Sequence, residues 1–348
     1  MHEMRGMQIS GMPIREKLGR LVAGAFADNF SRKIDYLRIS VTDRCNLKCL
    51  YCMPDGGLRH FSTSSILTTR EIIRFAGAAL RHGVSKVRIT GGEPLLRGDI
   101  LELVESIKGL GIKDLSITTN GLMLAEMAGP LKKAGLDRVN ISLDTLKADR
   151  YKLLTRGGEL VHVWEAIQAA ERSGLSPVKI NVVPIRDMND DEVVEFARLT
   201  MEKDWHIRFI ELMPVGQRGK WSSEKRVKKA ELIGKISVLG KLSILEYRGK
   251  GPSRNYRLEG AKGVIGFISP ISECFCQWCN RLRLTANGRI RPCLFSDTEV
   301  DIITPMRRGA SDEQLDELFR RAVCLKPAGH RLKDNDFSSL SSMSKIGG

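Results

Sequence analysis

Short apolar segments alternate with amphipathic stretches over the first two thirds of the chain. Six of these segments are rich in β-branched and aliphatic residues and are short enough to be buried strands. The predicted strands are Tyr36–Val41, Lys86–Thr90, Asp114–Thr118, Arg138–Leu143, Val178–Val183 and Ile207–Leu212. The stretches between them carry apolar residues at helical spacing, so strands and helices are expected to alternate along the chain.

The stretch between the first two predicted strands shows the helical pattern most clearly. Thr68 followed three residues later by Glu71 forms a capping box, and Gly83 follows the last apolar position. We therefore predict a helix over Thr69–Arg81, whose apolar stripe consists of Ile72, Ile73, Phe75, Ala76, Ala79 and Leu80.

Six strand–helix repeats predict an α/β fold with a parallel sheet and right-handed crossovers. Six units are too few for a closed eight-stranded barrel, so we expect an incomplete (β/α)6 TIM-like barrel. In such a fold the functional side chains gather at the carboxyl ends of the strands.

The repeat pattern ends after Pro214. A polar, basic stretch from Gly216 to Arg226 follows, and then one helical segment (229–239) and two strand-like segments (243–247 and 264–269). We predict a barrel over residues 28–214 and a smaller C-terminal domain over 215–325 that caps the barrel mouth. Residues 1–27 are an N-terminal extension, and residues 326–348 form a tail that ends in two glycines.

The composition is that of an ordinary globular protein, with 42% hydrophobic and 28% charged residues among 348. No apolar run approaches the roughly 18 residues of a membrane span, and no secretion signal is recognisable. We therefore expect a cytoplasmic protein. The basic residues within 1–27 are a weak indication of a mitochondrial presequence, and we favour a frayed basic start as their explanation.

The net charge of +15 indicates an anionic partner. Between Lys203 and Arg257, fourteen Lys and Arg residues stand against five Asp and Glu residues. A solvated basic face, nucleic acid, membrane headgroups or a small polyphosphate would each suit this excess. Aromatic residues do not alternate with the charges as they do in single-strand binding grooves, so we favour a nucleotide over nucleic acid or a membrane.

Eight cysteines in a chain without an export signal favour metal or redox chemistry over disulfides. Cys45, Cys49 and Cys52 lie within eight residues, directly after the first predicted strand. Zinc sites and ferredoxin-type clusters normally use four protein ligands. Three thiolates would leave one iron of a 4Fe–4S cluster open to another ligand.

The segment from Arg44 to Cys52, with Tyr51 before the third cysteine, resembles the radical S-adenosylmethionine superfamily. The resemblance implies that the open iron binds the amine and carboxylate of S-adenosylmethionine, which is then cleaved to a 5′-deoxyadenosyl radical. The turn Thr90-Gly91-Gly92-Glu93-Pro94 matches the methionine-binding turn of that superfamily. The cofactor-binding residues implied by the resemblance are Tyr51, Gly92, Ser142 and Met213.

The second cysteine group has the spacing Cys276-x2-Cys279-x13-Cys293. With Cys274 as a fourth ligand, this spacing also suits a zinc ribbon. Arg281 and Arg283, however, point to the same side of an extended segment, and paired guanidinium groups bind anions well.

Together, these features resemble the radical S-adenosylmethionine enzymes that cyclise GTP at the start of molybdenum-cofactor synthesis. The resemblance implies a second 4Fe–4S cluster on Cys276, Cys279 and Cys293, with an open iron that contacts guanine. It also implies that the adenosyl radical removes the 3′ hydrogen of the ribose and that 3′,8-cyclo-7,8-dihydroguanosine 5′-triphosphate forms. The implied GTP-binding residues are Arg38, Arg88, Thr118, Lys179, Arg208, Arg281 and Arg283.

The same resemblance implies an electron donor protein and cyclic pyranopterin monophosphate synthase as the downstream partner, and it allows a homodimer. Two alternatives remain at this stage: another two-cluster enzyme that modifies a peptide, and a zinc-bearing nucleic-acid module. Cys274 departs from the family pattern and would close the open iron if it ligated the second cluster. Gly347 and Gly348 are expected either to be a loose end or, as in the family, to enter the active site.

Overall fold

The computed structural model describes residues 21–22, 25–53, 57–214, 219–245, 251–330 and 343–347. Most of the predicted N-terminal extension, most of the predicted tail and the terminal Gly348 therefore lie outside the described residues.

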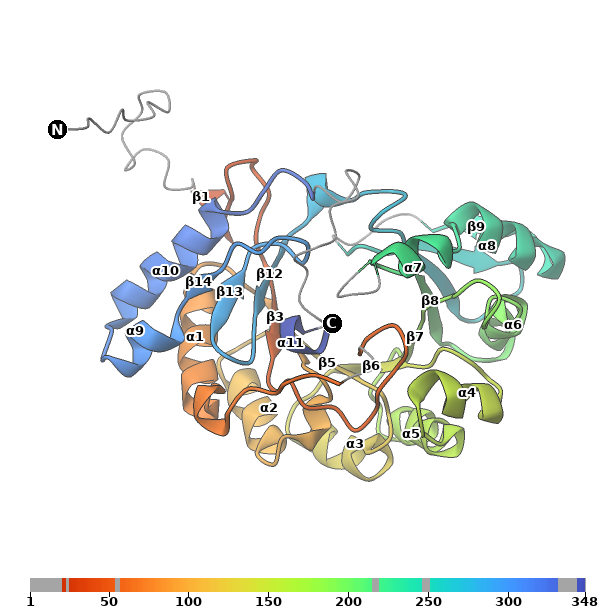
Figure 1. The fold of residues 1–348 in the computed structure, drawn as a ribbon, viewed down its shortest axis with the longest axis horizontal. Coiled ribbons are helices and arrows are strands. Elements are labelled where there is room, and N and C mark those ends of the chain that lie inside the picture. Colours follow the sequence, from red (N-terminus) through yellow and green to blue (C-terminus); the bar gives the residue numbers. More distant parts are fainter. Residues whose placement is uncertain are drawn as a thin grey trace.

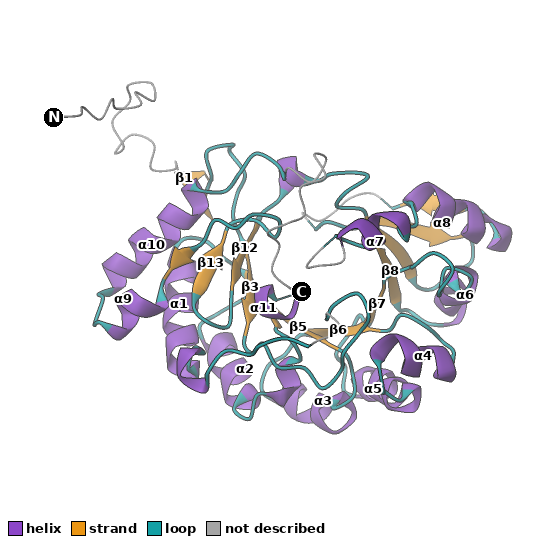
Figure 2. Cartoon of the chain, in the orientation of Figure 1, coloured by secondary structure: helices purple, strands orange, loops and turns teal. Residues whose placement is uncertain are grey.

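The described chain is a mixture of helices and strands in nearly regular alternation (Figure 2). The strands are β1 (Leu21–Val22), β2 (Ala25–Phe26), β3 (Tyr36–Ser40), β4 (Lys86–Thr90), β5 (Asp114–Thr119), β6 (Arg138–Ser142), β7 (Lys179–Val182), β8 (His206–Ile210), β9 (Leu242–Ile244), β10 (Arg254–Leu258), β11 (Val264–Ile268), β12 (Arg281–Leu284), β13 (Arg289–Arg291) and β14 (Val300–Asp301). The α-helices are α1 (Thr69–Arg81), α2 (Ile100–Gly109), α3 (Leu124–Lys133), α4 (Ala148–Thr155), α5 (Leu160–Arg172), α6 (Val193–Glu202), α7 (Gly219–Glu224), α8 (Lys229–Ile236), α9 (Ile303–Arg307), α10 (Asp312–Cys324) and α11 (Met343–Ile346). Among the helices of the described ranges, none is both long enough and apolar enough to span a membrane.

The six predicted strands are confirmed as β3 to β8, with ends that shift by one or two residues. They pair in sequence order and in parallel, and the sheet curves around a central space (Figure 1). The predicted helix Thr69–Arg81 is α1, and both hydrogen bonds of its capping box are present. The incomplete TIM-like barrel is therefore the observed fold.

The C-terminal segments continue this sheet at both of its edges. Strand β12 pairs in parallel with β3, and β11 pairs in parallel with β8. Short antiparallel strands then complete a 12-stranded array with β14 at one end and β9 at the other. Figure 1 shows α11, close to the C-terminus, inside the curve of the sheet.

The two faces of the barrel strands have different chemistry. In β3, Leu37 and Ile39 are fully buried beneath the outer helices, whereas Arg38 between them faces the interior. Strand β4 repeats the pattern, with Val87 and Ile89 buried and Arg88 facing inward. Successive side chains of a strand point to opposite faces. The apolar residues therefore pack against the outer helices, and the polar residues line the barrel interior.

Candidate active site

The barrel interior contains a cavity of about 530 Å³, within the usual size range of small-molecule sites. The predicted residues of all three classes line it: the cysteines Cys45, Cys49, Cys52, Cys276, Cys279 and Cys293, the cofactor residues Tyr51, Gly92, Ser142 and Met213, and the substrate residues Arg38, Arg88, Thr118, Lys179, Arg208, Arg281 and Arg283. One cavity therefore brings together residues that are more than 200 positions apart in the sequence.

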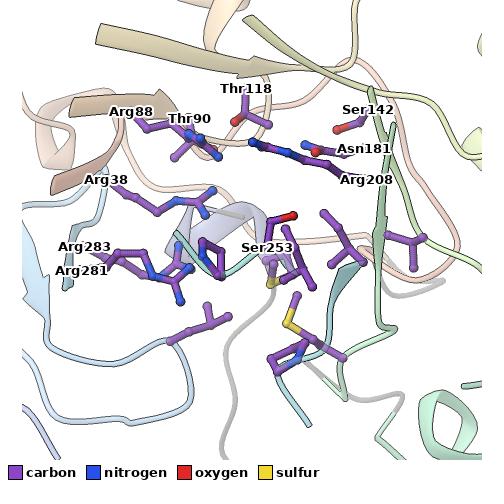
Figure 3. Close-up of a pocket in the computed structure, with 18 of the residues that line it drawn as sticks. Arg38, Arg88, Thr90, Thr118, Ser142, Asn181, Arg208, Ser253, Arg281 and Arg283 are labelled. Carbon is purple, nitrogen blue, oxygen red and sulfur yellow. The ribbon is translucent and has the colours of Figure 1, made fainter. Parts of the chain in front are cut away.

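Strand register aligns three arginines along one wall of the cavity. Arg283 on β12 lies directly opposite Arg38 on β3, which in turn lies opposite Arg88 on β4. Figure 3 shows Arg38, Arg281 and Arg283 pointing into the cavity from the same side. Parallel pairing of neighbouring strands thus converts arginines from three distant segments into one cationic surface.

The opposite wall carries Lys179 and Asn181 on β7 and Arg208 on β8. Asn181 and Arg208 are direct register partners, and Arg208 Nη1 donates a hydrogen bond to Asn140 Oδ1 on β6 at 3.2 Å. Figure 3 shows Arg208, Asn181 and Ser142 on this side, facing the arginines of the first wall.

Burial and mutual repulsion lower the pKa values of several basic side chains in the cavity. Burial, together with Arg208 and other nearby arginines, lowers the pKa of Lys179 to about 6. Burial and neighbouring guanidinium groups also lower the pKa of Arg208 to about 9 and that of Arg38 well below its usual value. A bound polyanion would remove both the desolvation cost and the repulsion, so the cavity is suited to a multiply charged anion.

Thr118 Oγ1 and Asn181 Oδ1 are among the buried polar atoms of the cavity wall that have no hydrogen-bond partner within the described structure. Buried polar atoms are nearly always satisfied in folded proteins, and exceptions commonly mark a ligand position. Both atoms therefore add neutral hydrogen-bonding groups to the cationic site.

The first cysteine group lies on the loop that follows β3. Backbone N–H groups of Cys52 and Met53 both donate to the carbonyl of Cys49 at 3.0 Å, which folds the loop into a tight turn. Burial raises the pKa of the Cys45 thiol and raises that of Cys49 well above its usual value. A positive metal centre would reverse this effect, because thiols bind metals as thiolates.

The Gly91-Gly92 turn packs directly against the backbone that leads into this loop. The Gly92 N–H donates to the Thr42 carbonyl at 2.8 Å, and the Glu93 N–H donates to the Arg44 carbonyl at 2.7 Å. A Cβ atom on Gly92 would lie 2.2 Å from the Arg44 oxygen, closer than any real contact. The glycine is therefore needed for backbone-to-backbone packing beside Cys45.

Glu93 has a structural role that the sequence analysis did not assign. Its carboxylate accepts hydrogen bonds from the Leu95 N–H, the Thr119 hydroxyl and the Asn120 N–H at 2.8–3.1 Å. Burial outweighs these bonds and raises the pKa of Glu93 to about 7. Glu93 thereby joins the glycine turn to the end of β5.

Asp144 joins the cysteine loop to the ends of β6 and β7, and the sequence analysis did not identify it either. Oδ2 accepts from the Tyr51 hydroxyl at 2.6 Å, and Oδ1 accepts from the Val183 N–H at 2.8 Å. Burial raises the pKa of Asp144 to about 6, although both hydrogen bonds oppose that rise. Asn189 donates from Nδ2 to the Asp144 carbonyl at 2.6 Å and so fixes the backbone that carries this carboxylate.

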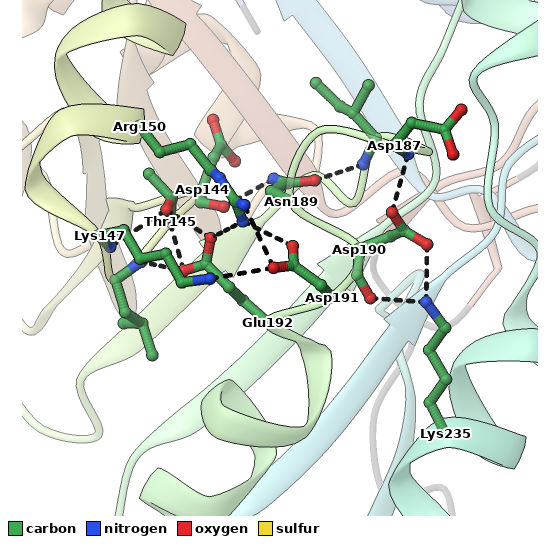
Figure 4. A network of polar contacts seen from close by, with 12 residues as sticks. Asp144, Thr145, Lys147, Arg150, Asp187, Asn189, Asp190, Asp191, Glu192 and Lys235 are labelled. Carbon is green, nitrogen blue, oxygen red and sulfur yellow. Dashed lines mark hydrogen bonds and ion pairs between the residues drawn. The ribbon is translucent and has the colours of Figure 1, made fainter.

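A network of polar contacts involves the residues that follow Asp144 in the sequence (Figure 4). The Glu192 carboxylate accepts from the Thr145 hydroxyl at 2.7 Å and from the Leu146 N–H at 2.6 Å, and it pairs with Arg150. Asp191 also pairs with Arg150, at 2.5 Å. The loop before α6 is thus tied to the loop after β6.

The second cysteine group comes from the C-terminal part of the sequence and lines the same cavity. Burial of the Cys279 thiol raises its pKa, but nearby Arg281 and Lys326 outweigh burial and bring that pKa to about 6. Lys326 also donates from Nζ to the carbonyls of Arg281 and Pro292 at 2.7 and 2.8 Å. This lysine therefore holds together the two segments that carry Cys279 and Cys293.

The position of Gly347 bears on the predicted role of the terminal glycines. Gly347 is buried, has a φ of +74° and accepts a hydrogen bond from Arg283 Nη1 through its carbonyl oxygen. A Cβ atom there would lie 2.9 Å from Cβ of Ser40 and 3.1 Å from Cγ2 of Thr90. Only glycine fits this backbone conformation and this space, next to the ends of β3 and β4.

Further residues of the cavity wall were missed by the sequence analysis as substrate or cofactor residues. Asn181 lies two positions after Lys179 on the same strand face, so strand alternation could have identified it. Arg138, the first residue of β6, also lines the cavity, and its guanidinium group forms an ion pair with the Asp114 carboxylate at 2.5 Å. Ser253 reaches the cavity from the stretch before β10, and no sequence pattern indicates this position.

The chain matches two protein-family models and is similar to a solved structure. Residues 39–200 match the radical SAM superfamily model, and residues 205–332 match the model Molybdenum Cofactor Synthesis C. The structure of Streptococcus suis SuiB bound to S-adenosylmethionine is similar with a TM-score of 0.58 and 18% identity, covering 77% of this chain and 63% of SuiB, and shares the fold.

Proteins related in sequence have a higher identity to this chain than SuiB has, and the matches cover nearly their whole length. GTP 3′,8-cyclase of Pelotomaculum thermopropionicum is 49% identical over 324 residues, which cover 92% of this chain and 99% of the relative. GTP 3′,8-cyclase of Moorella thermoacetica is 49% identical over 323 residues, with the same coverage of 92% and 99%. The chain therefore belongs to the radical SAM superfamily and, within it, to the GTP 3′,8-cyclase family.

Proposed function

We propose that this protein converts GTP to 3′,8-cyclo-7,8-dihydroguanosine 5′-triphosphate, the first step of molybdenum-cofactor biosynthesis, with S-adenosylmethionine and two 4Fe–4S clusters. The observation that carries the proposal is that one cavity unites two cysteine trios with a wall of arginines. Family membership supports the same reaction.

The number of ligands supports clusters over zinc ions at the two trios. Zinc structural sites normally take four protein ligands, whereas three thiolates can hold a 4Fe–4S cluster with one open iron. We assign the first cluster to Cys45, Cys49 and Cys52, and the second to Cys276, Cys279 and Cys293.

The first cluster and S-adenosylmethionine, when bound, supply a 5′-deoxyadenosyl radical. The chain's own contribution is to hold the cofactor beside the Cys45 loop. Gly92, Ser142 and Met213 line the cavity and would hold S-adenosylmethionine there, with Gly92 placing its turn directly against the backbone of Arg44. Tyr51 keeps the loop in place through its bond to Asp144.

The arginine wall is proposed to bind the triphosphate. Arg281 and Arg283 approach from β12 and Arg38 from β3, and forked guanidinium groups suit phosphate oxygens. Arg88 on β4 continues this wall, Lys179 and Arg208 approach from the facing wall, and Thr118 on β5 also lines the cavity. This arrangement would hold the triphosphate in the same cavity as the two cysteine trios.

Domain organisation and partners complete the proposal. The two family-model matches are separated between residues 200 and 205, which supports a division of the chain close to Pro214.

Cleavage of S-adenosylmethionine consumes an electron, so the reaction needs an electron donor protein. The product would pass to cyclic pyranopterin monophosphate synthase, and a homodimer is compatible with the fold.

The test is anaerobic reconstitution followed by incubation with S-adenosylmethionine and GTP deuterated at the 3′ carbon. We expect about eight irons per chain, four for each cluster, and deuterium in the released 5′-deoxyadenosine. Label that stays in the nucleotide would refute the proposed hydrogen abstraction. Preferred turnover of a peptide would instead support the alternative two-cluster function.

A further inference from the structure

Three metal-ligating side chains converge beside the second cysteine trio. The sulfur atoms of Cys274 and Cys276 and a ring nitrogen of His330 all lie within 4.8 Å of one another. Cys276 and His330 are half-buried, whereas Cys274 is exposed. Two thiols and one imidazole at this separation can contact the same ion, and the exposed side offers an entry path.

Two contacts hold the His330 ring in place. Its Nε2 lies 2.7 Å from the carbonyl oxygen of Pro270, which can only accept a hydrogen bond. Nε2 therefore carries the proton, and Nδ1 is the nitrogen with the lone pair. A backbone carbonyl on the second ring nitrogen is the usual outer partner of a metal-bound histidine. Phe295 packs edge-on against the ring, with 5.1 Å between the centroids, and restricts its rotation.

Arg32 holds the two segments that carry these ligands in fixed relative positions. Its Nη1 donates to the carbonyls of Cys276 and Ala328 at 2.7 and 3.1 Å, and its Nη2 donates to the Pro327 carbonyl at 2.7 Å. Arg32 is itself buried and paired with Asp28 at 2.6 Å. Arg32 thus fixes the backbone of the two segments that carry the ligands, which favours a specific metal site.

We propose that Cys274, Cys276 and His330 form a site for a single divalent ion of the zinc class. Thiolate and imidazole ligands select borderline ions such as Zn²⁺ over Mg²⁺ or Ca²⁺. Three protein ligands leave the fourth tetrahedral position to water on the exposed side. Binding releases the thiol protons and involves no change of oxidation state.

This site is additional to the proposed function and shares one residue with it. Cys276 is also an assigned ligand of the second cluster, so one chain cannot hold the single ion and the complete cluster at the same time. The site therefore belongs to the chain before the second cluster is assembled or after it is lost. Cys274 takes part in the single-ion site alone.

The test is titration of the reduced, cluster-free full chain with Co²⁺ under anaerobic conditions. Cys45, Cys49 and Cys52 are replaced by Ser in all samples, so that the first trio does not bind the ion. We expect one Co²⁺ per chain, a near-ultraviolet thiolate-to-cobalt absorption and displacement by Zn²⁺. Cys274→Ser and His330→Asn should each weaken binding at least about tenfold, whereas the control Cys324→Ser should not change it.

Two further variants distinguish this site from the cluster trio. Cys279→Ser and Cys293→Ser should keep the Co²⁺ affinity and spectrum, because neither residue belongs to the proposed site. Loss of binding in these variants, with full binding in Cys274→Ser, would assign the ion to the trio and overturn the proposal. Absence of stoichiometric binding in the parent chain would also overturn it. Circular dichroism checks folding, and Cys274→Ser changes an exposed side chain.

The outcome is independent of the GTP reaction. Cys274→Ser in the otherwise native chain should reconstitute with the same iron content and cyclise GTP as the parent does. Failure of both proteins to cyclise GTP would refute the proposed function and leave the Co²⁺ result unchanged.

Discussion

The hydroxyl of Tyr51 donates a hydrogen bond to Oδ2 of Asp144 at 2.6 Å, across 93 positions of sequence. The bond connects the first cysteine loop to the backbone just beyond β6. Since the other carboxylate oxygen accepts from the Val183 N–H, one carboxylate fixes three elements around the cofactor position. The loop that carries the cysteines is thereby held against the barrel.

Tyr51→Phe should loosen this loop. The change removes one hydrogen bond to a carboxylate, which is worth about 1–3 kcal/mol, and it should raise the KM for S-adenosylmethionine more than it lowers kcat. The matched control is Tyr151→Phe, because the Tyr151 hydroxyl is buried and makes no hydrogen bond within the described structure. Thermal unfolding and steady-state kinetics measure the two effects. Equal behaviour of the two variants would mean that the Tyr51 bond does not position the loop.

Arg283→Ala should weaken GTP binding by about 1.5–3 kcal/mol, the range for hydrogen bonds to charged groups. Isothermal titration of the reconstituted protein measures the affinity, and an iron assay checks that both clusters remain. Arg289→Ala is the control, since Arg289 pairs with Asp301 on the neighbouring strand and does not line the cavity. Unchanged affinity in Arg283→Ala would remove this arginine from the triphosphate site.

GTP binding should take up protons near neutral pH. The pKa of Lys179 is about 6 in the ligand-free protein because of burial and nearby arginines, so the amine is mostly neutral at pH 7.5. A bound polyanion favours the charged form and raises this pKa, and GTP affinity should then fall as the pH rises above about 6.

Titration calorimetry in two buffers with different ionisation enthalpies measures that proton uptake at pH 7.5. Lys179→Met should abolish it, whereas Lys229→Met, outside the cavity lining, should not. Identical uptake in the Lys179 variant would show that another group binds the proton.

Gly347→Ala should impair GTP cyclisation while iron content and uncoupled cleavage of S-adenosylmethionine are retained. The added methyl group would meet Ser40 and Thr90 at about 3 Å, so the tail would have to leave its position beside Arg283. Gly309→Ala is the control for backbone strain alone, because Gly309 also has a positive φ but has open space around it. Full cyclisation activity in Gly347→Ala would favour a loose C-terminal end.

Features encoded over short distances could be predicted from the sequence. The alternation Tyr36-Leu37-Arg38-Ile39-Ser40 already separates a helix-facing from an inward-facing side of a strand. The first cysteine trio lies within one loop, and two cysteines of the second trio lie within another, so their short spacings indicated metal centres. The capping box of α1 involves neighbouring residues, and its position was correct.

Pairings across long sequence distances needed the tertiary structure. Parallel register between β12 and β3 decides that Arg283 lies opposite Arg38, and no local pattern encodes that register. The carboxylate of Asp144 acquires its role only where two loops meet. Cys274 lies close to His330 only in the folded chain, where Arg32 joins Cys276 to Ala328. Local periodicity determines which face of an element is polar, whereas packing of the whole barrel determines which polar residues meet, because that choice depends on contacts summed over many distant segments.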